Sequence, residues 1–234
     1  MSKNFKNLIM NWEAEGYLLS KRKFKENSNI INVFTNEYGK MSGIVYGANS
    51  RKIRNFLQLS NKIFTFYNSK SENRIGYFKT ELINPISPKY FSDKKRTSVL
   101  LSITSILNIL LPESQPYKKL YSSLESLFDK LDSDYWPYYY LFWEIDLIKE
   151  LGFDQNLKDF NNILGDKEII DIEVDGIKYK IPYFIIKELI PKQIKNELIR
   201  KGLNFTRTVL VNKFFLPNNL TFPKSRVILE NYFV

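Results

Sequence analysis

The stretch Gly43 to Phe66, GIVYGANSRKIRNFLQLSNKIFTF, decides how the chain is interpreted. It begins with a buried strand that breaks at Gly47, and it leads into a strongly β-prone run from Ile63 to Tyr67. The exposed loop between them carries three cations, Arg51, Lys52 and Arg54. A cationic loop beside an aromatic strand suits a surface that follows a phosphate backbone and offers rings on which bases stack. The stretch therefore predicts a nucleic-acid-binding β domain.

Short β-prone segments fill the chain around this stretch. Five strands are expected, separated by turn residues: Tyr17 to Lys23, Asn29 to Thr35, Lys40 to Tyr46, Asn61 to Tyr67 and Arg74 to Ile83. Gly43 and Gly76 lie inside two of them and mark the sharp bends that a small closed barrel requires. The pattern favours a barrel of the oligonucleotide/oligosaccharide-binding (OB) type, and an SH3-like barrel fits it as well.

The β pattern ends at Asn84-Pro85-Ile86-Ser87-Pro88. Two prolines three residues apart are expected to exclude both a strand ladder and a helix, so a domain joint is predicted there. The predicted division is a disordered extension over residues 1–11, with Met10 as an alternative start, an OB domain over residues 12–84 and a helical domain over residues 85–234.

Apolar residues recur at helical spacing after the joint. We expect a helix capped by Ser92 or Asp93 and ended by Pro112, a second over Pro116 to Leu131, and a third capped by Asp134 and ended by Gly152. Together they predict a small antiparallel bundle. A β-hairpin is expected near residues 169–181, around Asp175-Gly176, and helices resume from Pro191 and over Ser225 to Tyr232. The predicted fold class is α+β, an OB barrel followed by a mainly helical domain.

The chain contains no Cys and no His, which excludes whole classes of function. Disulfides, thiolate zinc sites, cysteine nucleophiles and imidazole bases are ruled out. An enzyme would have to rely on lysine, or on carboxylates with a hard cation such as Mg²⁺. The acidic run is interpreted as the exposed side of a hairpin, and its members are Asp166, Glu168, Asp171, Glu173 and Asp175. These residues offer no strong candidate site, so no enzyme activity, catalytic residue, metal or cofactor is expected, with a carboxylate-metal nuclease as the open alternative.

The formal net charge is +10, and it is concentrated at the beginning of the chain. Residues 1–84 hold 14 Lys and Arg against 6 Asp and Glu, whereas residues 85–150 hold 8 against 9. Such a distribution is typical of a polyanion binder, although a lysine-rich composition produces the same excess in unrelated proteins. The longest apolar run, Val99 to Leu111, is too short for the roughly 20 residues of a membrane span. No signal peptide is evident, so a cytoplasmic location is expected.

Three groups of cations are candidate DNA contacts. The first is Lys21, Arg22 and Lys23, with Lys25; the second is Arg51, Lys52 and Arg54; the third, in the late helices, includes Arg207, Lys224 and Arg226. Nucleic acid crosses the second and third strands of an OB barrel between flanking loops, so the first two groups are expected to line one groove. Arginine in the second group favours phosphate binding, because guanidinium grips phosphate through two hydrogen bonds. The alternative for each group is a solvated face.

Two groups of aromatic residues are also candidate sites. The first is a set of candidates for base stacking, Phe64, Phe66 and Tyr77, considered together with Tyr67 and Phe78, because strand alternation sends about half of such rings into the barrel. The second belongs to a helix that is more aromatic than a core requires, and it consists of Tyr138, Tyr139, Phe142 and Trp143. It is a candidate groove for a partner peptide, with core packing as the alternative.

Several segments, in order from residue 12 to the C-terminus, resemble the RecO family of bacterial recombination mediators. They are Trp12 to Ser20, Val33 to Gly39, Val45 to Ala48 followed by Ser50-Arg51, Leu57-Gln58, Trp143-Glu144 leading to Leu151-Gly152-Phe153, and Lys224-Ser225-Arg226. The resemblance implies an N-terminal OB domain, a helical C-terminal domain and no covalent catalysis. It places DNA-contacting basic positions at Arg51, Lys52, Lys224 and Arg226.

The resemblance also implies an activity and partners. Proteins of this family bind single- and double-stranded DNA, anneal complementary strands, engage the acidic tail of single-stranded DNA-binding protein and, with RecR, help load the recombinase RecA. A cytoplasmic, nucleoid-associated location follows from this role. Three other functions fit the residues themselves: an RNA-binding OB protein, a carboxylate-metal nuclease, and a protein-binding adaptor whose charge is compositional.

The chain departs from the family pattern in two places. Many relatives hold four zinc-binding cysteines after the segment that corresponds to Gly152-Phe153, and this chain has none. Some relatives place arginine just before the pair that corresponds to Trp143-Glu144, in the region that receives the acidic tail, and here Leu141 and Phe142 stand there.

Overall fold

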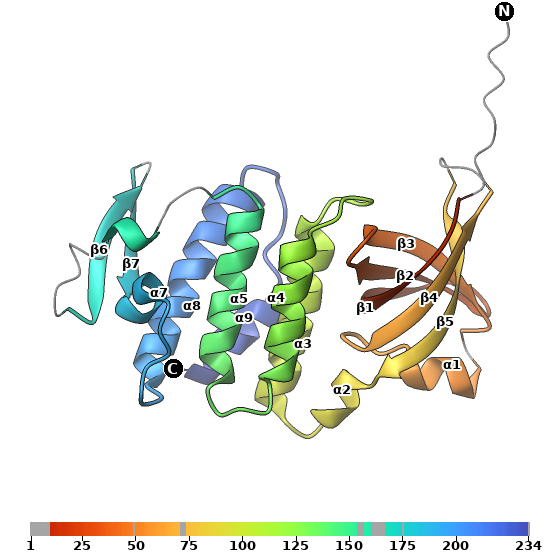
Figure 1. Ribbon diagram of the computed structural model, residues 1–234, viewed down its shortest axis with the longest axis horizontal. Coiled ribbons are helices and arrows are strands. Elements are labelled where there is room, and N and C mark those ends of the chain that lie inside the picture. The colour runs from red at the N-terminus through yellow and green to blue at the C-terminus, as the bar shows by residue number, and fades with distance from the viewer. Residues whose placement is uncertain are drawn as a thin grey trace, which may run out of the picture. The chain divides into compact units, whose positions relative to one another are not determined.

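The chain forms two compact units, the first ending at Tyr121 and the second beginning at Ser122. The computed structural model in Figure 1 describes residues 10–48, 50–70, 74–153, 157–160, 167–174 and 176–233. The first unit extends past the predicted joint at residue 84, because helix α3 (Lys94–Leu110) packs on strand β1 (Met10–Lys25). Of the predicted disordered extension, residues 1–9 lie outside the described residues, whereas Met10 and Asn11 belong to β1.

Five strands of the first unit close into a barrel, which confirms the predicted OB architecture. They are β1, β2 (Ser28–Thr35), β3 (Gly39–Tyr46), β4 (Lys62–Ser69) and β5 (Gly76–Asn84). The order around the barrel is β1-β2-β3-β5-β4, and only β3 and β5 pair in parallel. Strand β1 is longer than predicted because its first half pairs with β4 and its second half with β2.

Two predictions at the ends of the barrel strands are wrong. The cationic stretch after β3 is not a loop but helix α1 (Arg51–Phe56), because the Ser50 hydroxyl accepts a hydrogen bond from the Ile53 amide and caps its first turn. The proline-rich joint holds a one-turn helix, α2 (Ile86–Lys89). Pro88 fits within it because amides in the first turn of a helix need no intrahelical acceptor.

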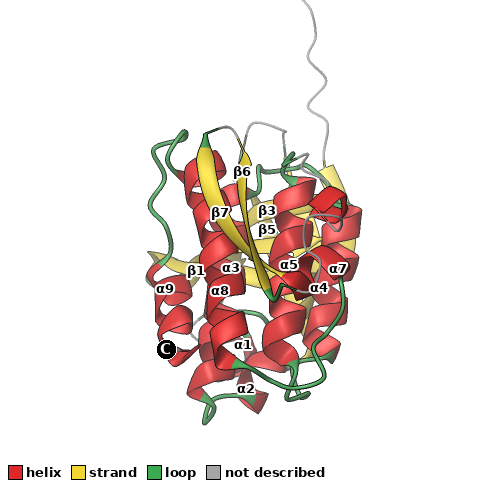
Figure 2. Ribbon diagram, turned by 90° about the vertical axis from the view of Figure 1, so that its left-hand side faces the viewer, coloured by secondary structure: helices red, strands yellow, loops and turns green. Residues whose placement is uncertain are grey.

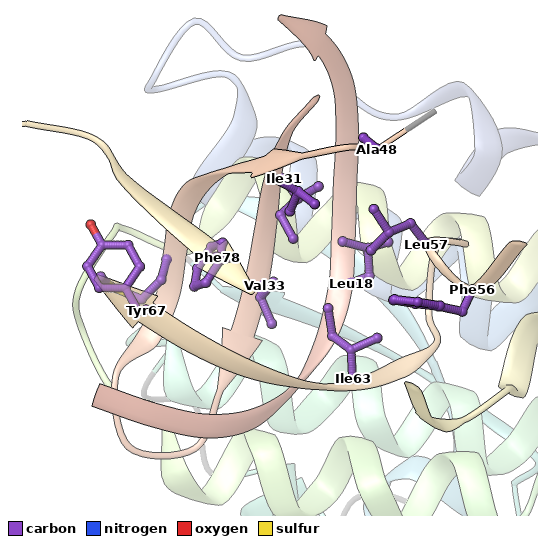
Figure 3. Packing of buried hydrophobic residues seen from close by; sticks show 11 residues of the cluster. Leu18, Ile31, Val33, Ala48, Phe56, Leu57, Ile63, Tyr67 and Phe78 are labelled. Atoms are coloured by element: carbon purple, nitrogen blue, oxygen red, sulfur yellow. The ribbon is translucent and has the colours of Figure 1, made fainter. Parts of the chain in front are cut away.

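The interior of the barrel is filled by alternate side chains of its strands, as Figure 3 shows. At the point where β3 meets β5, Gly43 lies opposite Gly76. A Cβ atom on Gly43 would lie 2.4 Å from the Phe78 ring, and one on Gly76 would lie 2.4 Å from the Tyr67 ring. The two glycines therefore make room for two rings of this core and allow the barrel to close.

The C-terminal part of helix α3 contacts the outer side of β2 and β3 through Asn108. The Asn108 side chain accepts a hydrogen bond of 2.7 Å from Asn32, and its backbone carbonyl accepts one of 2.8 Å from Lys40. Beyond the helix, the Ser42 hydroxyl donates to Glu113 at 2.5 Å. Asp93 caps α3 by accepting from the Arg96 amide at 2.9 Å, as predicted. These contacts cover part of the outer side of the two strands, while Tyr46 at the end of β3 remains exposed.

The second unit is mainly helical. Its elements are α5 (Trp136–Glu150), the 3-10 turn η1 (Leu157–Phe160), the hairpin β6 (Ile169–Val174) and β7 (Ile177–Pro182), α7 (Tyr183–Lys187), α8 (Asn196–Leu210), the π-helical turn η2 (Val211–Phe215), α9 (Lys224–Glu230) and η3 (Asn231–Phe233). Helix α4 (Lys118–Asp129) crosses from the first unit into the second. In Figure 2 the hairpin lies over α8, which contacts β7.

The helical predictions are only partly correct. The three-helix bundle is wrong, because α3 belongs to the first unit and α5 packs on α8. A Cβ atom on Gly202 would lie 2.7 Å from a methyl group of Leu141, so this glycine permits the close approach of α8 to α5. Asp134 is not the cap of α5, whose N-cap is Tyr135 without a side-chain bond. The hairpin prediction is confirmed by the register from Ile169 to Pro182, although Asp175 lies outside the described residues.

No helix in the described part of the chain is both long and apolar enough to cross a bilayer.

The Gly43→Ala substitution tests the closure of the barrel. The added methyl group overlaps the Phe78 ring, so we expect the free energy of unfolding to fall by about 1–3 kcal/mol, measured by urea denaturation. The double variant Gly43→Ala, Phe78→Leu should lose less than the sum of the two single losses, because the smaller side chain relieves the overlap. A Gly43→Ala protein as stable as the parent would contradict this explanation of closure.

Candidate nucleic-acid interface

The outer side of β2 and β3 is covered around Phe34 and Lys40, whereas Tyr46 at the end of β3 remains exposed. Phe34 on β2 is fully buried, and its ring centroid lies 5.4 Å from that of Tyr121. Lys40 on β3 is 8% exposed, and burial lowers the pKa of Lys40 while Glu113 partly offsets this. The end of α3 and the segment after it occupy this part of the surface, so a strand cannot cross it as expected, and a crossing near Tyr46 stays a prediction.

The two N-terminal groups of cations are brought together at one end of the barrel. The Gly47 amide donates to the Asn27 carbonyl at 2.9 Å, which ties the end of β3 to the turn between β1 and β2. The Lys21 ammonium donates to the Leu57 carbonyl at 2.7 Å, at the C-terminal end of α1. Burial of this ammonium lowers the pKa of Lys21. Segments that are about 30 residues apart in sequence thus contribute to the surface at this end of the barrel, where alternation along β1 turns Arg22 to the opposite side from Lys21 and Lys23.

We call this surface the basic rim. Its members are all exposed, and they are Lys21, Arg22, Lys23, Lys25, Arg51, Lys52 and Arg54. No ion pair joins any of them to an acidic residue in the described ranges of the chain. Within α1, Arg51 and Arg54 are three residues apart, which places both guanidinium groups on the same side of the helix. The rim is a cluster of positive charge that is not neutralised by described acids of its own chain.

The predicted stacking residues point away from the barrel interior. Phe66 is 39% exposed and Tyr77 is 36% exposed, and Phe64 is half-buried with its ring 4.9 Å from that of Phe66. Tyr67 and Phe78 point inward and belong to the core, as alternation requires.

Sequence reasoning missed Tyr46, the most exposed ring among the described barrel strands at 60%. Its ring lies 6.4 Å from that of Tyr77, at the end of β3 where the basic rim begins. The signal was present in the sequence, because Met41, Gly43 and Val45 alternate inward and leave Tyr46 facing outward.

Carboxylates limit where phosphate can lie on this aromatic surface. Phe64 stands between Glu15 on β1 and Glu81 on β5, each directly opposite it in register. Glu15 is paired with Lys62 at 2.9 Å, whereas the Glu81 side chain is exposed. A phosphate group near Phe64 would meet negative charge on one side, so the backbone of a bound strand is better placed toward the basic rim.

In the third group of cations, one residue is buried, one is paired with an acid and one is exposed. Arg226 is completely buried, and the prediction that it contacts DNA is wrong, because its guanidinium donates to Glu144 at 2.6 and 3.0 Å and to Glu230 at 2.8 Å. Arg207 remains partly exposed but pairs with Glu230 at 2.9 Å. Lys224 is exposed, and its contact with DNA stays a prediction.

Arg226 and Glu144 form the polar centre of the second unit. Glu144 lies in the apolar sequence of α5 and also accepts from the hydroxyl groups of Tyr140 at 2.5 Å and Thr206 at 2.6 Å. Burial alone would lower the pKa of Arg226, but Glu144 and the neighbouring Glu230 raise it above the ordinary arginine value. Arg226 therefore stays charged, and its hydrogen bonds connect α9 to α5 and α8. A glutamate flanked by apolar residues, between Trp143 and Ile145, was the sequence signal for a buried cationic partner.

Of the four residues predicted to form a partner groove on α5, two are buried and two are half-buried. Tyr138 and Trp143 are at most 1% exposed, so their part of the prediction is wrong. Tyr138 packs edge-on against Phe184, and its hydroxyl accepts from the Lys195 amide at 3.1 Å. Burial raises the pKa of Tyr138. Tyr139 and Phe142 are half-buried, and a role for them in partner binding stays a prediction.

The acidic hairpin carries ordinary surface ion pairs. Lys195 pairs with Glu168 at 2.5 Å, and Lys180 pairs with Asp171 at 3.5 Å. Asp166 and Asp175 of the acidic run lie outside the described residues. Within the described ranges, no group of three acidic side chains is placed to hold a metal ion.

These features define a class of protein, an OB-barrel protein with a helical second unit. The family model described as Recombination protein O N terminal matches residues 10–86, and Recombination protein O C terminal matches residues 92–159. The chain belongs to this family, RecO, and the resemblance found in the sequence is confirmed. The break between the two matches falls at α2, close to the joint predicted from the prolines.

Curated relatives support the same conclusion. A protein of Roseobacter denitrificans, named DNA repair protein RecO, is 34% identical over 145 residues, which are 62% of this chain and 60% of that relative. A RecO of a Ruegeria species is 34% identical over 149 residues and is matched over 62% of its length. A RecO of Wolbachia pipientis is 26% identical over 240 residues, covering 94% of this chain and 99% of that relative.

Replacing Arg226 separates its structural role from DNA contact. Arg226→Met leaves Glu144 buried without its partner, so we expect the free energy of unfolding to fall by about 3–5 kcal/mol. The matched control, Lys224→Met, removes an exposed charge from the same helix and should change stability by no more than about 0.5 kcal/mol. Urea denaturation followed by tryptophan fluorescence measures both. Similar losses in the two variants would refute the assignment of a buried ion pair.

Proposed function

We propose that the protein is a non-enzymatic DNA repair mediator that binds DNA through the basic rim, anneals complementary strands and helps load a recombinase onto single strands coated with single-stranded DNA-binding protein. The observation that carries the proposal is the convergence of two separate basic segments on one end of an OB barrel, in a chain of the RecO family. The seven cations of the rim are exposed and are not paired with described acids.

The proposed mechanism is electrostatic. Two complementary strands repel each other through their phosphates, and this repulsion opposes the first contacts of annealing. Cations of the rim neutralise phosphates of both strands and release their counterions, so the strands approach at a lower free-energy cost. Arg51 and Arg54, held on one side of α1, supply the bidentate donors that suit phosphate oxygens. No covalent step is required.

The proposal includes partners and a location. The proposed protein partners are RecR and the acidic tail of single-stranded DNA-binding protein. The recombinase that the protein helps to load is proposed to be RecA. Membership of the RecO family supports these partners. The proposed location is the cytoplasm, at the nucleoid. Of the residues considered for the tail, Tyr139 and Phe142 keep exposed surface. The proposed mediator needs no structural metal, since neither Cys nor His occurs in the sequence.

Charge reversal at the rim tests the binding surface. Arg51→Glu with Lys52→Glu should weaken binding to single strands of every sequence alike, because backbone contacts carry no sequence information. The plot of log affinity against log salt should lose about 0.7 of slope for each phosphate contact removed. The control, Lys118→Glu with Lys119→Glu, makes the same charge change on α4 outside the rim. Equal effects of the two double variants, or an affinity insensitive to salt, would argue against the rim.

Strand annealing tests the activity. Fluorescently labelled complementary strands should anneal faster with the protein than without it, and the gain should persist when the strands carry single-stranded DNA-binding protein. The rim double variant should lose most of the gain, whereas the α4 control should keep it. Unchanged annealing rates would refute the mediator role, and tighter binding to RNA than to DNA of the same sequence would favour an RNA-binding protein instead.

A further inference from the structure

An open groove of about 580 Å³ lies on the outer surface formed by β1, β4 and β5. The side chains that point outward into it are those of Asn11, Glu13, Phe66, Asn68, Tyr77 and Lys79. Its volume falls within the range of about 300–1,000 Å³ typical of small-ligand sites, and the rings of Phe66 and Tyr77 are exposed in it. We call it the aromatic groove.

Strand pairing arranges these residues in two rows. Phe66 is directly opposite Glu13 on one side and Lys79 on the other. In the next row, Asn68 is directly opposite Asn11 and Tyr77, and its amide donates a hydrogen bond to Asn11. Opposite residues on neighbouring strands lie about 5 Å apart, so each row presents its groups across a width similar to that of a planar base.

The charges of the groove differ from those of the basic rim. Glu13 and Lys79 stand on either side of an exposed ring, and neither forms an ion pair within the part of the chain that the structure describes. The groove therefore holds one carboxylate and one ammonium group, with the exposed ring of Phe66 between them. A phosphate group would be attracted by Lys79 but repelled by Glu13, whereas an uncharged planar ligand with donors at one edge and acceptors at the other satisfies both.

We propose that the aromatic groove takes a nucleobase turned out of a single strand, and that Glu13 makes it prefer cytosine to thymine. This inference rests on the proposed binding of single-stranded DNA and adds a base preference to it. The base stacks on Phe66, and its sugar-phosphate continues past Tyr77 and Tyr46 toward the basic rim. Asn11 and Asn68 offer further amide groups to the edge of the base.

The preference follows from hydrogen-bonding chemistry. Cytosine carries an exocyclic amino group that donates to a carboxylate. Thymine carries a carbonyl oxygen at that position, and its ring N–H lies between two carbonyl oxygens that a carboxylate approaches unfavourably. Lys79, on the other side of the ring, donates to a carbonyl oxygen and so accepts either pyrimidine. Stacking alone does not discriminate in this way, because every base has an aromatic face.

Competition between oligodeoxycytidylate and oligodeoxythymidylate of equal length tests the inference on the full chain. At one fixed salt concentration and slightly alkaline pH, we expect the cytosine strand to bind about fivefold tighter, as one hydrogen bond to a charged group allows. Glu13→Gln should bring the ratio close to one. The control Glu81→Gln removes the same charge from the same outer surface, opposite Phe64 and outside the groove, and should leave the ratio unchanged.

The outcomes separate this inference from the proposed function. Salt-dependent binding of both strands with equal affinity, or a preference that survives Glu13→Gln, would overturn the base preference and leave DNA binding intact. If both glutamine variants lost the preference equally, the preference would depend on overall charge. That result would also overturn the assigned role of Glu13. Binding of neither strand would overturn the base preference and DNA binding together.

Discussion

Closure of the barrel depends on the parallel contact between β3 and β5, which pairs Gly43 with Gly76. Because neither residue has a side chain, the Phe78 and Tyr67 rings occupy the space where Cβ atoms would lie. The same contact pairs Ile44 with Tyr77 and so fixes the outward position of Tyr77, whose ring lies near that of Tyr46. The core and the exposed aromatic surface are therefore consequences of one backbone approach.

Arginine has opposite roles in the two units. In the basic rim, Arg51 and Arg54 remain in water, where an unpaired charge keeps its hydration and attracts polyanions at long range. In the second unit, Arg226 has lost all contact with water, and its desolvation is offset by Glu144 and Glu230. The residue type alone does not distinguish the two roles. What distinguishes them is whether a carboxylate lies within reach in the folded chain.

Local patterns in the sequence predicted what depends on local physics. Alternation predicted that about half of the rings on β4 and β5 fill the barrel, and the candidates Phe66 and Tyr77 do face outward; glycines inside strands correctly indicated a closed barrel. The helix over Arg51 to Phe56 was missed although Ser50 is a good cap, because the surrounding glycine and asparagine suggested a loop.

Features that depend on distant segments were not predictable in this way. The contact between the end of α3 and β2 joins Asn108 to Asn32, 76 residues apart. The partner of Arg226 is Glu144, 82 residues away, and neither contact leaves a periodic trace in the sequence.

The positions of the acidic residues on the barrel determine where the candidate interface favours phosphates and where it favours bases. Glu13, Glu15 and Glu81 lie on the outer surface of β1 and β5, and the basic rim lies at the other side of the Tyr46 and Tyr77 pair. Screening in physiological salt acts over about 8 Å, so the acids and the rim influence a bound strand locally rather than cancelling each other. Phosphates are favoured at the rim and disfavoured over β4, while uncharged bases are free to enter the aromatic surface. Under the proposed function, a strand that satisfies both conditions has its backbone toward α1 and its bases toward β4, so charge sets its orientation and the proposed groove adds the base preference.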